Sequence, residues 1–79
     1  MGLIKDVVDY IQDNDVKLIV ENNNVKIINY VEIVRFDDNI IIIKHDNGTF
    51  KINGQNLFIA KLLTKEILIG GHVKTIEFG

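Results

Sequence analysis

The segment ILIGGHVKTIEF, residues 67–78, consists of two apolar stretches on either side of a glycine pair. Isoleucine, valine and phenylalanine favour strands, and glycine adopts backbone conformations that other residues avoid. Between its apolar positions the segment carries few groups capable of chemistry. We therefore predict two strands, residues 66–69 and 73–78, with a structural bend at Gly70 and Gly71.

A loose repeat extends this pattern through the chain. Residues 52–59 and 69–76 share the spacing Ile-x-Gly-x4-Ile, with glycine at Gly54 and Gly71. Residues 27–34 fit the same spacing, with Asn29 in the glycine position and valine at the end. Glycine and asparagine best tolerate left-handed backbone. We interpret each unit as a strand, a bend or bulge, and a second strand.

The remaining apolar stretches complete a mainly β fold. The Asn-Gly pair ending at Gly48 is typical of a type I′ hairpin turn. Residues 25–36 are apolar on both alternating sets, which fits a strand buried on both faces or a bulge that switches faces. Residues 56–63 fit a strand or a short helix. We expect a small antiparallel sheet or β-roll of about six to seven short strands, the others being residues 16–20, 40–44 and 49–52.

In residues 1–15 the apolar side chains recur with a different period from that of the predicted strands. Leu3, Ile4, Val7, Val8 and Ile11 recur at helical spacing, with charged residues between them. This pattern predicts an amphipathic helix over residues 1–15. We favour a helix that covers one face of the sheet, and the alternative is a docking helix for a partner. A chain of 79 residues fits one domain, with the β part spanning 16–79.

Composition limits the function classes. The net charge is −2 and the nine Lys and Arg residues are scattered, so we expect no nucleic-acid partner. The run of four isoleucines at 40–43 is too short to span a bilayer, and no signal-peptide pattern is present, so we expect no membrane insertion. There is no Cys, which excludes disulfides and suits the cytoplasm.

Groups for catalysis are few. The pairs Asp37-Asp38 and His45-Asp46 lie in turns at the two ends of the strand predicted over 39–44, roughly 20 Å apart. His72 has no second ligand at metal-binding spacing, and the chain has no serine. We predict no catalytic, cofactor or metal site. A metal-dependent hydrolase using these two pairs is a remote alternative.

The aromatic and basic residues suggest a second alternative. Lys26, Arg35, Lys44 and Lys51 could converge on one face of a small barrel that binds an oligonucleotide or oligosaccharide. Such a face needs exposed aromatic rings. Phe50 and Phe58 have apolar neighbours, so we favour core packing for both, and Phe78 also alternates with apolar residues.

Strand edges are the feature that suggests an activity. A small sheet with isoleucine-rich strands and no proline tends to pair with further strands. Lys44, Lys51, Lys61 and Lys74 would protect such edges, or an edge could bind a partner strand or support polymer growth. We predict a protein-interaction module that forms a homo-oligomer.

Residues 18–78 resemble the YabP/YqfC family of bacterial sporulation proteins. The closest pieces are KINGQNLFI (51–59) and EILIGGHVKTIEF (66–78). The resemblance implies a non-enzymatic assembly or scaffold factor in formation of the spore envelope, coat or cortex. It also implies a place in the cytoplasm of the mother cell near the forespore envelope, and a YqfD-like membrane protein as a possible partner.

Overall fold

The computed structural model describes residues 15–79, which form one six-stranded antiparallel sheet. The mainly β, antiparallel fold class is confirmed, whereas the helix predicted over 1–15 lies outside the described residues except for Asp15. Along the sheet the strand order is β1-β2-β6-β5-β4-β3. The strands are β1 (Lys17–Glu21), β2 (Asn24–Ile28), β3 (Glu32–Phe36), β4 (Ile40–His45), β5 (Gly48–Leu62) and β6 (Glu66–Phe78).

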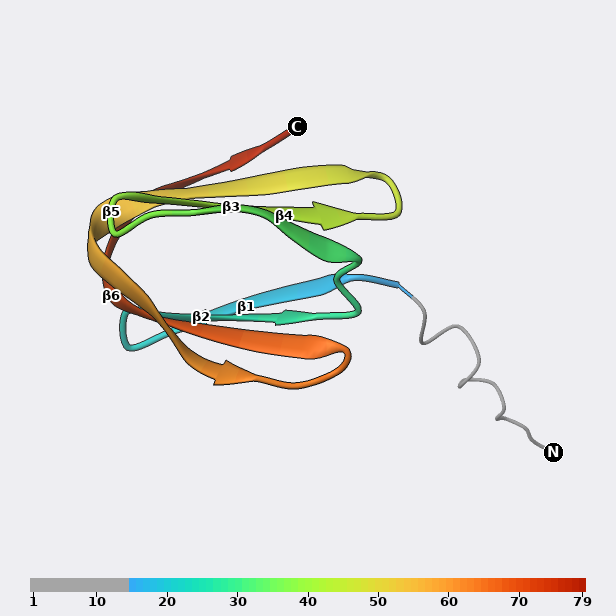
Figure 1. Ribbon diagram of the computed structural model, residues 1–79, viewed down its shortest axis with the longest axis horizontal. Coiled ribbons are helices and arrows are strands. Elements are labelled where there is room, and N and C mark those ends of the chain that lie inside the picture. The colour runs from blue at the N-terminus through green and yellow to red at the C-terminus, as the bar shows by residue number, and fades with distance from the viewer. Residues whose placement is uncertain (1–14) are drawn as a thin grey trace, which may run out of the picture.

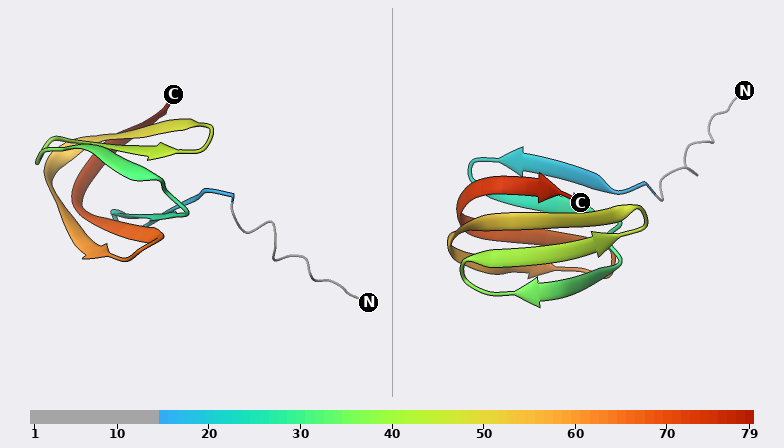
Figure 2. Two further views of the ribbon diagram at one scale, coloured as in Figure 1. Left: turned by 45° about the vertical axis from the view of Figure 1, so that its right-hand side comes forward. Right: turned by 90° about the horizontal axis from the view of Figure 1, so that it is seen from above.

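The sheet folds over on itself because its two central strands, β5 and β6, are long and bent (Figure 1). One layer contains β3, β4, the first half of β5 and the second half of β6. The other layer contains β1, β2, the first half of β6 and the second half of β5 (Figure 2). The stretches 49–52 and 56–63, predicted as separate elements, thus belong to one strand, and 66–69 and 73–78 to another.

The bend occurs where Asn56 of β5 meets Gly71 of β6. Both residues have left-handed backbone, with φ of 53° at Asn56 and 112° at Gly71. The register shifts here, because Gln55 pairs with His72 and Phe58 pairs with Gly70. Two residues of β5 therefore face one residue of β6, which is the geometry of a β-bulge and bends both strands. A Cβ at Gly71 would collide with the backbone oxygen of Asn56.

The other positions of the repeat have different geometry. Asn29 has φ of 67°, and its N–H donates to the Lys65 carbonyl at 2.6 Å. It ends β2, so the long strand predicted over 25–36 is in fact two strands joined by a link between the layers. Gly54 has no left-handed φ but lies at a register shift, where a Cβ would collide with the His72 backbone oxygen.

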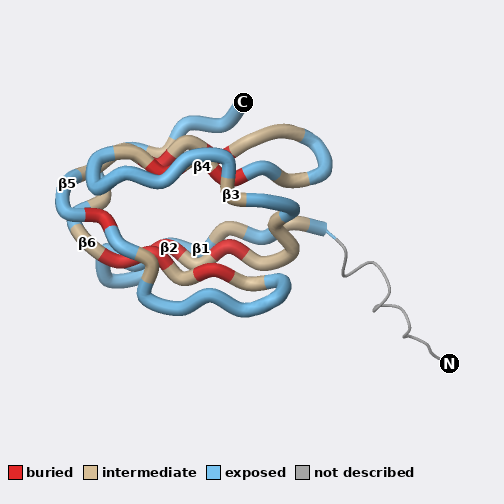
Figure 3. The backbone as a smooth tube through the Cα atoms, viewed as in Figure 1, coloured by how far each residue is buried: buried red, intermediate tan, exposed pale blue. Residues whose placement is uncertain are grey.

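The core lies between the two layers (Figure 3). It is built from alternate positions of four strands, as expected when one face of each strand is covered. Isoleucine dominates it, which suits β-branched side chains on a pleated surface. The buried residues are Val25, Ile27, Ile41, Ile43, Phe50, Ile52, Leu57, Ile67 and Ile69.

The phenylalanines differ from expectation. Phe50 is 4% exposed and its ring meets that of Phe78 edge-to-face at 5.4 Å, as predicted for a core residue. Phe58 is 52% exposed, so the core prediction is wrong for it. After the bulge, Leu57 and Ile59 point to the core, and the residue between them points outward. The Phe58 ring covers Gly70, where a Cβ would lie 2.5 Å from its Cζ atom.

We expect Gly71→Val to lower the free energy of unfolding by about 1–3 kcal/mol, because valine is strained at this φ and collides with Asn56. Chemical denaturation monitored by circular dichroism measures the change. His72→Val is the matched control, since the next residue along β6 is exposed and lies outside the left-handed region. Equal stability of the two variants would contradict the assignment.

We expect the effect of Gly70→Ala on stability to depend on Phe58. In the wild-type background the added methyl displaces the ring and destabilises the protein. In a Phe58→Ala background the same change is neutral or stabilising by up to about 1 kcal/mol, because alanine loses less backbone entropy than glycine. A double-mutant cycle measures the coupling, and additive effects would show that the ring and the glycine do not interact.

Candidate interaction surfaces

Within the part of the chain that the structure describes, four stretches of strand are unpaired on one side. Strands β1 and β3 end the sheet. The other two stretches arise from the bend, because β2 pairs with β6 only up to Ile69 and β4 pairs with β5 only up to Asn53. Beyond Ile69 the second half of β6 has no neighbour on that side. In β5 the N–H groups of Gly54 and Leu57 still donate to the carbonyls of Asn39 and Asp38, and the stretch after Leu57 has no neighbour there. Unpaired strand edges present backbone N–H and C=O groups to which another strand can bind.

Three of these four edges are interrupted. In β3 the register shifts between Ile33 and Arg35, which leaves Val34 as a bulged residue. The second half of β5 has a shift between Ile59 and Lys61. In β6, Lys74 is left over where the register with β5 shifts. Bulges bend and twist an edge, and thereby hinder pairing with a further strand.

Strand β1 is the regular edge among residues 15–79. All five of its residues pair with β2 in continuous register, from Lys17 with Ile28 to Glu21 with Asn24. The two strands are joined by Asn22 and Asn23, with φ of 51° and 65°. Positive φ at both residues defines a type I′ turn, the turn that matches strand twist.

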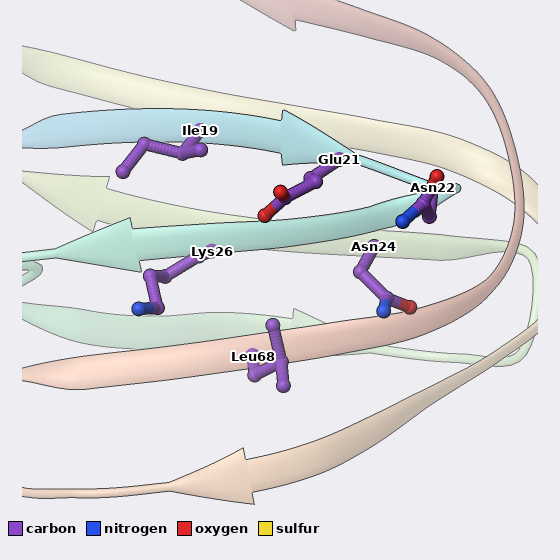
Figure 4. Close-up of a pocket in the computed structure, with 6 residues that line it drawn as sticks. All are labelled: Ile19, Glu21, Asn22, Asn24, Lys26 and Leu68. Atoms are coloured by element: carbon purple, nitrogen blue, oxygen red, sulfur yellow. The ribbon is translucent and has the colours of Figure 1, made fainter.

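A hollow lies on the outer face of the layer that contains β1 (Figure 4). Its lining mixes apolar, amide and charged side chains from β1, β2 and β6. Lys26 forms an ion pair with Glu66 across this face, with Nζ and Oε2 3.5 Å apart. The lining residues are Ile19, Glu21, Asn22, Asn24, Lys26 and Leu68. No concentration of one charge or of nucleophilic groups marks this hollow as a catalytic site.

Exposed apolar side chains gather on the unpaired stretches and on the links next to them. Six of the nine are 51–56% exposed and Phe78 reaches 70%. Exposed apolar side chains beside unpaired backbone groups fit an edge that a further strand could cover. They are Ile19 and Val20 of β1, Val31 before β3, Val34 and Phe36 of β3, Phe58 and Leu62 of β5, Leu63 after it, and Phe78 of β6.

The acidic and histidine pairs remain at opposite ends of β4. Asp37 and Asp38 precede that strand, and His45 and Asp46 follow at its far end. Asp37 is held by Arg35, whose Nε lies 2.8 Å from its Oδ2. His45 accepts a hydrogen bond at Nδ1 from the Asn47 N–H at 3.2 Å. Within residues 15–79 no three potential metal ligands come together.

The basic residues do not share one face. Arg35, Lys44 and Lys51 alternate with inward-facing residues on the layer that contains β3 and β4, so they point outward from it. Lys26 lies on the outer face of the other layer. The prediction that four basic residues converge on one face is therefore wrong for Lys26. An edge-protecting role is also wrong for Lys44 and Lys51, which lie on paired strands, whereas Lys61 and Lys74 do lie on unpaired stretches.

Among the described residues, no helix has the length and apolarity needed to cross a membrane.

Comparison with known proteins gives the family. No curated protein and no solved structure matches the chain. The sequence model of the YabP family matches residues 12–79, which covers all six strands. The chain therefore belongs to the YabP family, a family associated with sporulation.

Proposed function

We propose that this protein is a non-enzymatic assembly factor in formation of the spore envelope, coat or cortex. It acts by self-association or by docking a partner on a strand edge. The observation that carries the proposal is the coincidence of unpaired backbone edges with the exposed apolar side chains. Backbone hydrogen bonds and apolar contacts are the two components of strand-addition binding.

The arrangement of the polar groups supports an interaction role. The carboxylate and imidazole side chains that could serve acid–base chemistry, such as Asp38 and His45, are separated by the length of β4. The two ion pairs within the described part, Arg35 with Asp37 and Lys26 with Glu66, are at least partly exposed. They stabilise turns and strand pairs.

The resemblance to the family supports a proposal for location and partner. We place the protein in the cytoplasm of the mother cell, next to the forespore envelope, with a YqfD-like membrane protein as a possible partner. Such a partner would supply the membrane anchor, while this domain would supply a rigid β surface. An extended segment of that partner could dock on an unpaired edge.

Deletion of the gene in its own host tests the role. We expect fewer heat-resistant spores with normal vegetative growth, because the defect is confined to envelope assembly. Re-expression of the wild-type gene during sporulation should restore the spore count, as should His72→Val, the variant expected to keep the fold. Normal spore counts together with a normal envelope in electron micrographs of the deletion strain would contradict the proposal.

A further inference from the structure

Strand β1 presents a definite set of backbone groups to its free side. In a two-residue hairpin, the residues that flank the turn exchange both hydrogen bonds, and the pattern then alternates along the strands. Glu21, Ile19 and Lys17 therefore direct their backbone groups toward β2. Leu18 and Val20 direct their N–H and C=O groups away from the sheet. These four groups can accept a further antiparallel strand.

The side chains of β1 divide between the two faces of the sheet. Leu18 and Val20 pair with core residues Ile27 and Val25, so they point to the inner face. Val20 is nevertheless 56% exposed, because no strand lies beyond β1 to cover its flank. Lys17, Ile19 and Glu21 point to the outer face, where Ile19 is 43% exposed.

The charges of β1 are complementary to those of a second β1 running in the opposite direction. With Ile19 opposite the Ile19 of the second copy, Lys17 of each chain faces Glu21 of the other. Leu18 then faces the second copy's Val20. This register joins unlike charges on the outer face and apolar side chains on the inner face, and both kinds of cross-strand pair are favourable.

Other registers lose this match. A shift of two residues along the strand places Lys17 or Glu21 opposite Ile19 and leaves both charges without an opposite partner. A parallel arrangement brings Lys17 beside Lys17 and Glu21 beside Glu21, which is unfavourable. The other sheet edge offers no equivalent, because a self-pair of β3 centred on Val34 sets Glu32 against Phe36, and Arg35 against Ile33, at a bulge.

We propose that the partner of β1 is a second copy of this chain, paired with it antiparallel about a two-fold axis at Ile19. The two six-stranded sheets then form one continuous sheet through both molecules. The same edge, β1, forms the contact in both copies. No free β1 edge then remains for a third copy, so the assembly ends as a dimer. This inference rests on the proposed function, because it specifies the surface for the self-association assumed there.

Charge exchange at β1 tests the register. Lys17→Glu alone places Glu opposite Glu21 at two positions, and Glu21→Lys alone places Lys opposite Lys17. Each should weaken dimerisation on the order of tenfold. The double variant Lys17→Glu/Glu21→Lys should recover the wild-type dissociation constant, and an equimolar mixture of the two single variants should form heterodimers. Sedimentation velocity of the full chain over a wide concentration range measures dimerisation of the two single variants, the double variant and the mixture.

Two exposed valines at opposite ends of the sheet provide a test variant of the β1 edge and its matched control. Val20 is 56% exposed on β1 and Val34 is 53% exposed on β3. Val20→Lys should abolish the dimer and Val34→Lys should leave it unchanged, with thermal unfolding of both variants confirming that they fold.

The outcomes separate this inference from the proposed function. A dimer that persists in Val20→Lys, or that the double exchange fails to restore, overturns the β1 interface while self-association stands. A wild-type chain that stays monomeric at all concentrations overturns the dimer. The spore count of the deletion strain still decides the proposed function in that case.

Discussion

The rest of the structure depends on the bend shared by β5 and β6. A flat six-stranded sheet of this sequence would expose its isoleucine-rich face to water. Because Asn56 and Gly71 take left-handed backbone at the same level, both central strands turn together and bring the two halves of that face into contact. Each fully buried aliphatic or aromatic side chain contributes roughly 1.5–3 kcal/mol. The nine buried residues therefore depend on two backbone conformations.

Much of the fold could be predicted from local signals. Alternating isoleucines mark the strands, and the Asn-Gly pair before Thr49 marks the hairpin between β4 and β5. The predicted type I′ turn is wrong there, because the two linking residues, Asp46 and Asn47, do not have positive φ. A glycine or asparagine inside an apolar run is ambiguous, because the same residue can end a strand or bend it. At Asn29 the chain ends β2 and crosses to the other layer, whereas at Gly54 and Gly71 the strand continues. Cross-strand partners decide between these outcomes, and they are distant in sequence.

The interaction surfaces were less predictable for the same reason. Which strand is an edge depends on strand order, and the lysines alone did not reveal it, since Lys44 and Lys51 proved to lie on paired strands. The exposed apolar positions of β1 look like core positions until the sheet order is known. The Asn56 bulge had no distinct signal either, beyond an asparagine next to an apolar run. It nevertheless sets the outward direction of Phe58.

The strand order also has a consequence for synthesis on the ribosome. Among the six strands of residues 15–79 the β1–β2 hairpin is made first, yet the strand it pairs with is β6, the last of the six. That hairpin cannot dock until nearly all of the domain has been translated. Isolated hairpins are marginal in water, and contacts between distant segments slow folding. Strands β1 and β2 thus remain without their partner strand β6 during most of translation, and the nascent chain acquires its stable fold late.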